Sequence, residues 1–136
     1  MLLPIMVGIV LGSGLVLLVR RSTRVGEVRL LTIGLVVTAL LYVVLALAGD
    51  RRELALETGG LAIFGALAWL GSRVSPIWLA LGWAGHVAWD VGLHLERAQQ
   101  VVPSWYPLFC VGFDLIVAGY LLSLGFPKQR SRADAA

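Results

Sequence analysis

Residues 83–94 read WAGHVAWDVGLH, an apolar segment that carries three ionisable side chains: His86, Asp90 and His94. These side chains follow one another at intervals of four residues, a spacing that places them on one face of an α-helix. An ionisable group at membrane depth costs on the order of 2.5–3.5 kcal/mol even on insertion scales, so such groups usually mark a functional site. We therefore expect this segment to decide both the fold and the function.

The composition is that of an integral membrane protein. Hydrophobic residues make up 59% of the 136 residues and charged residues only 14%, whereas about 25% is charged in an ordinary soluble domain. The net charge of +3 comes from basic residues in the expected loops and tail. They form no basic patch interleaved with aromatic residues, which argues against nucleic-acid binding. The single cysteine, Cys110, rules out an intramolecular disulfide.

Five apolar runs are candidates to cross a bilayer, which takes about 20 residues per helix. We expect an all-α membrane bundle in one domain of residues 1–126, with spans at about 2–19, 30–48, 54–70, 77–95 and 107–125, followed by a disordered cytoplasmic tail at 127–136. Gly8 and Gly12 form a small-xxx-small pair, which predicts a packing face. Pro76 is well placed to begin the fourth helix.

The distribution of basic residues predicts the orientation. Five spans place the two termini on opposite sides, and the loops on the C-terminal side carry more Lys and Arg than those on the other side. The positive-inside rule then predicts an outside N-terminus and a cytoplasmic C-terminus. We expect a multi-pass protein in the cell (inner) membrane, in contact with the lipid bilayer.

This topology brings further polar groups to the depth of the segment. Glu57 lies one turn inside the third span, and Cys110 and Asp114 lie four residues apart in the outer half of the fifth. At about 1.5 Å per residue, these groups and the polar face of the fourth span could line one cleft that opens outward. Small residues occupy the other face of the fourth helix and predict a groove that packs between neighbours: Ala84, Ala88 and Gly92.

Acid–base catalysis on a lipophilic small molecule, such as a polyene, a sterol or an epoxide, is the first use of such a cleft. Asp90 and Asp114 are the acid/base candidates, and His86 orients the proton or shuttles it. His94 and Glu57 are expected at the entrance. Aromatic faces can stabilise a developing carbocation, although packing is their commoner role. The residues expected to line the substrate site are Trp83, Trp89, Tyr106, Cys110 and Tyr42.

Metal coordination is the second use. The cofactor is expected to be either none or a divalent metal, and the candidate ligands are His86, Asp90, His94 and Asp114, an N/O set that suits zinc or non-haem iron. Residues 86 to 94 extend over about 12 Å of helix, too far for all three side chains to hold one ion. One His/Asp pair completed by a carboxylate of a facing helix is the feasible arrangement.

Proton- or ion-coupled transport is the third use. The transporter could be this chain alone, a homo-oligomer of it, or a complex with a partner subunit. The polar face ends at mid-membrane, because residues 77–82 offer no ionisable group, so transport ranks below a one-sided pocket. A structural role is the last alternative, in which His86 or Asp90 forms hydrogen bonds with Thr38, Tyr42 or Asp114 that hold the helices together, at about 0.6–2 kcal/mol each.

Residues 85–94, the segment Val102-Pro103-Ser104-Trp105-Tyr106 and the helix with Cys110 and Asp114 resemble small uncharacterised bacterial membrane proteins with an H-x2-W-D-x3-H segment. This resemblance implies no activity. More loosely, a five-span bundle with a His-x3-acid pair at His86 and Asp90 is similar to the emopamil-binding sterol isomerase family, in which a buried His and carboxylates move protons on a sterol. Membrane-embedded terpene cyclases use paired carboxylates in a similar way. The resemblances imply isomerase- or cyclase-like chemistry; a hydrolase is the other enzyme class considered.

Overall fold

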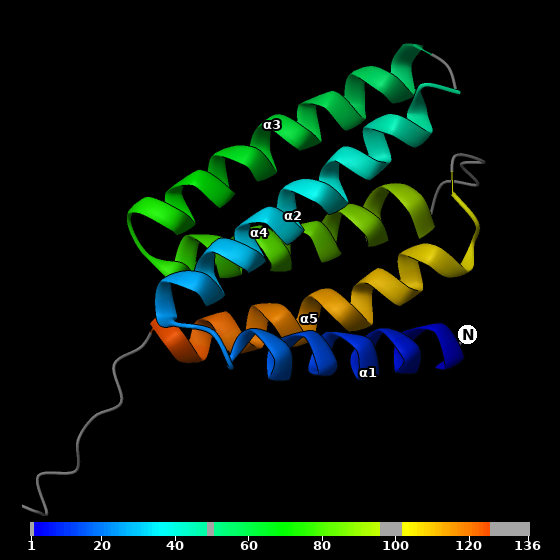
Figure 1. Cartoon of the computed structure of the whole chain (residues 1–136). Coiled ribbons are helices and arrows are strands. Elements are labelled where there is room, and N and C mark those ends of the chain that lie inside the picture. The colour runs from blue at the N-terminus through cyan, green and yellow to red at the C-terminus, as the bar shows by residue number, and fades with distance from the viewer. Residues whose placement is uncertain (1, 49–50, 96–101, 126–136) are drawn as a thin grey trace, which may run out of the picture.

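The computed structural model describes residues 2–48, 51–95 and 102–125, so the tail expected at 127–136 lies outside the described residues (Figure 1). Within these ranges the chain is all-α, as predicted. The elements are α1 (Leu2–Val19), α2 (Arg24–Ala46), α3 (Arg51–Arg73), α4 (Pro76–Trp89), the π-helix η1 (Asp90–Leu95) and α5 (Trp105–Gly125). Four of them, α1, α2, α3 and α5, are long and apolar enough to cross a membrane. The α4 helix has 14 residues and is continued by η1.

The helices after α1 begin before the apolar runs that predict them. α2 begins at Arg24, where we expected a loop as far as Arg29. Thr23 caps this end, because its side-chain oxygen accepts a hydrogen bond of 3.2 Å from the Gly26 amide. Hydropathy marks only the part of a helix that suits lipid, whereas backbone hydrogen bonding continues into the polar boundary. At α4 the prediction is confirmed, since Pro76 is the first helical residue and follows the N-cap Ser75.

The bundle has two packed helix pairs with α4 between them (Figure 1). α2 packs on α3, α1 packs along α5, and α4 contacts α5 and α3. The contact between α1 and α5 depends on glycine: a Cβ atom at Gly8 would meet the carbonyl oxygen of Phe109, and one at Gly112 would meet that of Ile5. The predicted packing face at Gly8 and Gly12 is therefore present, and α5 covers it.

An apolar core fills the end of the bundle where α2 and α4 begin. Its fully buried side chains include Leu31, Leu35, Leu79, Trp83, Val117 and Leu121. The indole nitrogen of Trp83 donates a hydrogen bond of 3.3 Å to the Leu31 carbonyl. We expected Trp83 to line a substrate site, but this tryptophan belongs to the core.

The predicted groove on α4 is wrong. Ala84, Ala88 and Gly92 are exposed, and nothing lies within 4 Å of a Cβ atom added at Gly92. The neighbours α3 and α5 pack on the sides of α4 that carry its large and polar residues, so the small-residue face stays uncovered by this chain. Amphipathic spacing alone cannot tell a face that a neighbour covers from one that lipid covers.

Candidate functional site

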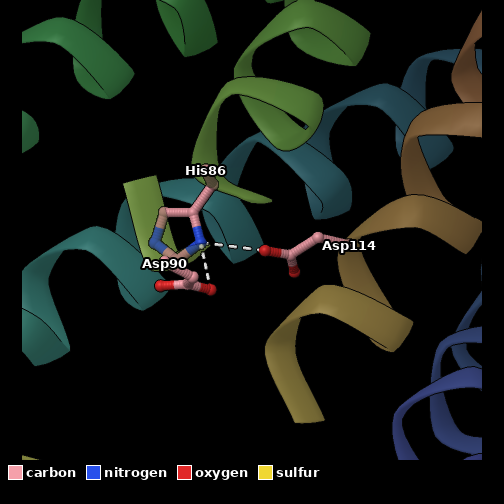
Figure 2. A group of neighbouring side chains, drawn as sticks. All are labelled: His86, Asp90 and Asp114. Carbon is pink, nitrogen blue, oxygen red and sulfur yellow. Dashed lines mark hydrogen bonds and ion pairs between the residues drawn. The ribbon is translucent and has the colours of Figure 1, made fainter. Parts of the chain in front are cut away.

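Four side chains from four elements meet inside the bundle. Tyr42 comes from α2, His86 from α4, Asp90 from the first position of η1 and Asp114 from α5. We call these residues the His86 group; Figure 2 shows three of them, with dashed lines from His86 Nδ1 to both carboxylates. A switch from α- to π-helical hydrogen bonding at Asp90 is of the kind that often accompanies a functional site.

The His86 group is tightly connected. His86 Nδ1 lies 2.8 Å from Asp114 Oδ2 and 3.5 Å from Asp90 Oδ2, and only the first distance is a hydrogen bond. The Tyr42 hydroxyl donates a hydrogen bond of 2.7 Å to Asp90 Oδ1. All four side chains are buried, with exposed fractions of 1% or less. Two carboxylates and one imidazole therefore share a site shielded from solvent.

A second cluster, the Glu57 group, lies beside the first. His94 Nε2 is 3.2 Å from Glu57 Oε1, and the indole nitrogen of Trp89 donates a hydrogen bond of 3.2 Å to Glu57 Oε2. Tyr42 connects the two groups, since its ring stacks on His94 with centroids 4.5 Å apart. Glu57 and His94 were expected at an entrance, and the structure buries both, with 5% and 7% of their surface exposed.

Aromatic side chains surround the two groups. Phe64 of α3 meets His86 edge to face with centroids 5.1 Å apart, and meets Trp89 at 5.7 Å. Tyr106 of α5 meets Tyr42 at 5.9 Å. The structure thus brings Tyr42, Trp89 and Tyr106 to the site as expected lining residues.

Cys110, also expected in the lining, is buried, and its thiol interacts with the hydroxyls of Tyr42 and Tyr106. It lies one helical turn before Asp114 on α5.

Sequence reasoning missed Phe64 and undervalued Tyr42. Phe64 lies seven residues after Glu57 on the buried face of α3, so helical periodicity could have placed it at the site. Tyr42 and Thr38 lie four residues apart on α2. Thr38 does bond to carbonyls of its own helix, those of Gly34 and Leu35, but Tyr42 crosses to Asp90.

Comparison with protein families gives a match to a family of unknown function, DUF6010, over residues 1–127. The chain belongs to the DUF6010 family. The match covers every helix described above, so the His86 and Glu57 groups both lie within the DUF6010 region. Neither the curated proteins nor the solved structures contain a match to the chain.

The His86 group of this DUF6010 chain could bind a metal. Ligand atoms of His86, Asp90 and Asp114 all lie within 4.8 Å of one another, and a nitrogen with two carboxylate oxygens suits zinc or iron. The fourth expected ligand, His94, lies instead with Glu57. This arrangement is the one foreseen on geometric grounds, a His/Asp pair completed by a carboxylate from a facing helix.

Several polar atoms of the DUF6010 site are buried without a hydrogen bond in the described part of the chain. They are His86 Nε2, Asp90 Oδ2 and both ring nitrogens of His94. Two of these atoms still have an ion-pair contact, since Asp90 Oδ2 lies 3.5 Å from His86 Nδ1 and His94 Nε2 lies 3.2 Å from Glu57 Oε1. Figure 2 shows His86 Nε2 on the side of the ring turned away from Asp114. Buried polar groups are seldom left unpaired, and an unpaired one in a native structure calls for an explanation.

Proposed function

We propose that this DUF6010 protein is a small membrane enzyme that performs acid–base chemistry on a lipophilic molecule, with His86 Nε2 as the group that takes up and returns the proton. One observation carries the proposal. His86 Nδ1 is held by Asp114 at 2.8 Å, while the buried Nε2 has no partner in the described part of the chain.

The hydrogen bond with Asp114 assigns the proton of neutral His86 to Nδ1. An ionised carboxylate only accepts hydrogen bonds, so Nδ1 must donate. The alternative tautomer would leave a buried N–H at Nε2 unpaired, and buried N–H groups without a partner are rarer than unpaired acceptors. Nε2 is then a bare nitrogen, the form that a general base needs.

The two carboxylates favour the cation that forms when Nε2 accepts a proton. Asp114 orients the imidazole and compensates its positive charge, as a carboxylate does in a catalytic triad. Asp90 adds a second negative charge 3.5 Å from Nδ1, and Tyr42 fixes it from α2. In an apolar surrounding these interactions are stronger than in water.

Lipophilic substrates fit the surroundings of this site. Phe64 supplies an aromatic edge next to the imidazole, and Trp89 packs on Phe64. The apolar side chains that the helices expose suit a protein whose substrate comes from the bilayer. Aromatic faces also stabilise a cationic intermediate. Isomerisation or cyclisation by proton transfer is the reaction class that these features support best.

Metal binding is the weaker use of the same atoms. A metal on Nδ1 of a neutral imidazole would move the proton to Nε2, which has no acceptor in the described part of the chain. Transport also has less support, because the core around Leu31, Leu79 and Leu121 lies beyond His86 toward the other end of the bundle. A relay through that core would need groups that its apolar side chains do not provide.

Deuterium exchange tests the proposed function without knowledge of the substrate. The protein is reconstituted in liposomes containing lipids extracted from the source cells, incubated in D₂O, and the lipids are analysed by mass spectrometry. A base at Nε2 that removes and returns protons should place deuterium on carbon in at least one lipophilic species.

The variants His86→Gln and Asp114→Asn should lower this incorporation by at least about 100-fold, the usual contribution of a general base. Ser123→Ala is the matched control on α5, because its exposed hydroxyl bonds only to the Tyr120 carbonyl of its own helix. Melting temperatures show whether each variant is folded. Absence of incorporation with the wild type, or full incorporation with folded His86→Gln, would refute the proposal.

A further inference from the structure

A second polar feature lies at the other end of the bundle, away from the His86 group. An open hollow of about 200 Å³ is lined by the first turn of α2 and by the turn between α3 and α4. Arg24 comes from α2, and Arg73 is the last residue of α3. The acid–base chemistry proposed above uses none of these residues.

The lining of the hollow, as far as the structure describes it, carries positive charge and no carboxylate. Two arginines line it, and the described lining includes no Asp or Glu. Arg24 uses one guanidinium nitrogen for a hydrogen bond of 2.6 Å to the Leu124 carbonyl, which fixes the side chain and leaves its other donors free. Arg73 forms no hydrogen bond or ion pair with the described residues. Two guanidinium groups at one hollow suit a phosphate, which arginine binds through paired N–H donors.

Neighbouring side chains place the hollow at the boundary between lipid and water. Trp69 in the last turns of α3 and Trp78 in the first turn of α4 are 60% and 39% exposed. Exposed tryptophans at helix ends are typical of the headgroup level. Val25 and Val74, both in the lining, are 77% and 66% exposed and offer apolar surface to an acyl chain.

We propose that this hollow binds the headgroup phosphate of an anionic phospholipid, with Arg24 and Arg73 on the phosphate and Val25 and Val74 against the upper part of an acyl chain. A free phosphate would use only the arginines. The exposed valines and tryptophans at the same end of the bundle favour a lipid over a free phosphate, because they offer apolar surface to its acyl chain. The basic loops gather at this end of the bundle, so the bound lipid belongs to the leaflet that the positive-inside rule makes cytoplasmic.

Native mass spectrometry of the full chain in detergent tests this inference. The protein is titrated with phosphatidylglycerol and, separately, with phosphatidylcholine of the same acyl chains, and bound lipid is counted. Phosphatidylglycerol should bind more tightly, and Arg73→Gln should weaken it about fivefold, the effect of one basic residue on an anionic lipid. Arg24→Gln should act in the same direction. Arg51→Gln, the same change at the first residue of α3 and the other end of that helix, should leave binding unchanged.

Each other outcome overturns the inference. Equal binding of the two lipids would show that the arginines do not select an anionic headgroup. An equal loss in Arg51→Gln would show a general charge effect. Displacement of phosphatidylglycerol by millimolar inorganic phosphate would assign the hollow to a soluble anion. If Arg24→Gln lowers the melting temperature by losing its bond to Leu124, the exposed Arg73 still decides the question, since it has no such contact.

Discussion

At the scale of single residues, Tyr42 is the side chain that ties the site together. It donates to Asp90 and stacks on His94, so it touches both polar groups at once. Tyr42→Phe keeps the ring and removes the hydroxyl, which leaves a buried carboxylate oxygen without its donor. We expect a loss of about 1–3 kcal/mol of stability, measured as a lower midpoint of unfolding in detergent.

Thr38→Val is the matched control for Tyr42→Phe, because it removes a hydroxyl one turn earlier on α2. That hydroxyl bonds only to the carbonyls of Gly34 and Leu35 on its own helix, so little stability should be lost. Equal losses in the two variants would mean that the bond between Tyr42 and Asp90 contributes nothing specific.

Asp90 distinguishes the acid–base account from the metal account. If proton transfer at His86 is the function, deuterium incorporation should survive dialysis against a chelator, and metal analysis should give the same result for the wild type and Asp90→Asn. A stoichiometric metal that is present in the wild type and lost in Asp90→Asn, together with loss of incorporation after chelation, would support coordination by His86, Asp90 and Asp114.

The pairing of these residues shows what a sequence can and cannot predict at this scale. Helical spacing placed His86 and Asp90 on one face, and depth in the membrane placed Asp114 at their level. Depth does not give the order of the helices around a bundle. The hydrogen bond between His86 and Asp114 was therefore only one of several pairings that the sequence allowed. Trp83 and Trp89 flank His86 symmetrically along the helix, and only the packing of the bundle assigns the first to the core and the second to Glu57.

At the scale of the elements, the contact between α1 and α5 makes the clearest prediction. A methyl group at Gly8 would meet the Phe109 carbonyl, and backbone cannot move aside as a flexible side chain can. Gly8→Ala should therefore separate the two helices and destabilise the fold by about 1–3 kcal/mol, the usual cost of overpacking. The midpoint of thermal unfolding is the measurement.

Gly14→Ala on the same helix is the control, since nothing lies within 4 Å of a Cβ atom added there. It should be neutral or slightly stabilising, because alanine has the higher helix propensity. A stable Gly8→Ala protein would show that α1 and α5 do not pack as described.

The helices themselves follow from hydropathy, and their ends do not. Capping by Thr23 and Ser75 sets where α2 and α4 begin, and the apolar runs alone carry no information about it. The change to π-helical geometry at Asp90 also has no signal in the spacing of apolar residues. We expected one continuous helix over residues 77–95, and the structure divides it at the residue that enters the site.

At the scale of the whole molecule, the orientation in the membrane makes a testable prediction. Ser22, in the turn before α2, and Ser104, just before α5, are both exposed and lie at opposite ends of the bundle. In a Cys110→Ala background, Ser104→Cys should react with a membrane-impermeant maleimide in intact cells. Ser22→Cys should react only after permeabilisation, because the positive-inside rule places its loop in the cytoplasm.

Labelling of Ser22→Cys but not Ser104→Cys in intact cells would reverse the orientation. The His86 and Glu57 groups would then lie toward the cytoplasm, and the phospholipid proposed at Arg24 and Arg73 would belong to the outer leaflet. Labelling of both from one side would contradict the spanning topology itself. The chemistry proposed at His86 does not depend on which of the two orientations holds.

The most direct measurement of the central claim is nitrogen NMR of the full-length protein, labelled with ¹⁵N in its histidines and reconstituted in lipid. The chain has only two histidines, so a His94→Gln sample assigns the His86 signals. The account predicts that the neutral form of the His86 ring carries its proton on Nδ1 and has a bare Nε2. A neutral ring with its proton on Nε2, and with Nδ1 either bare or bound to a metal, would contradict it.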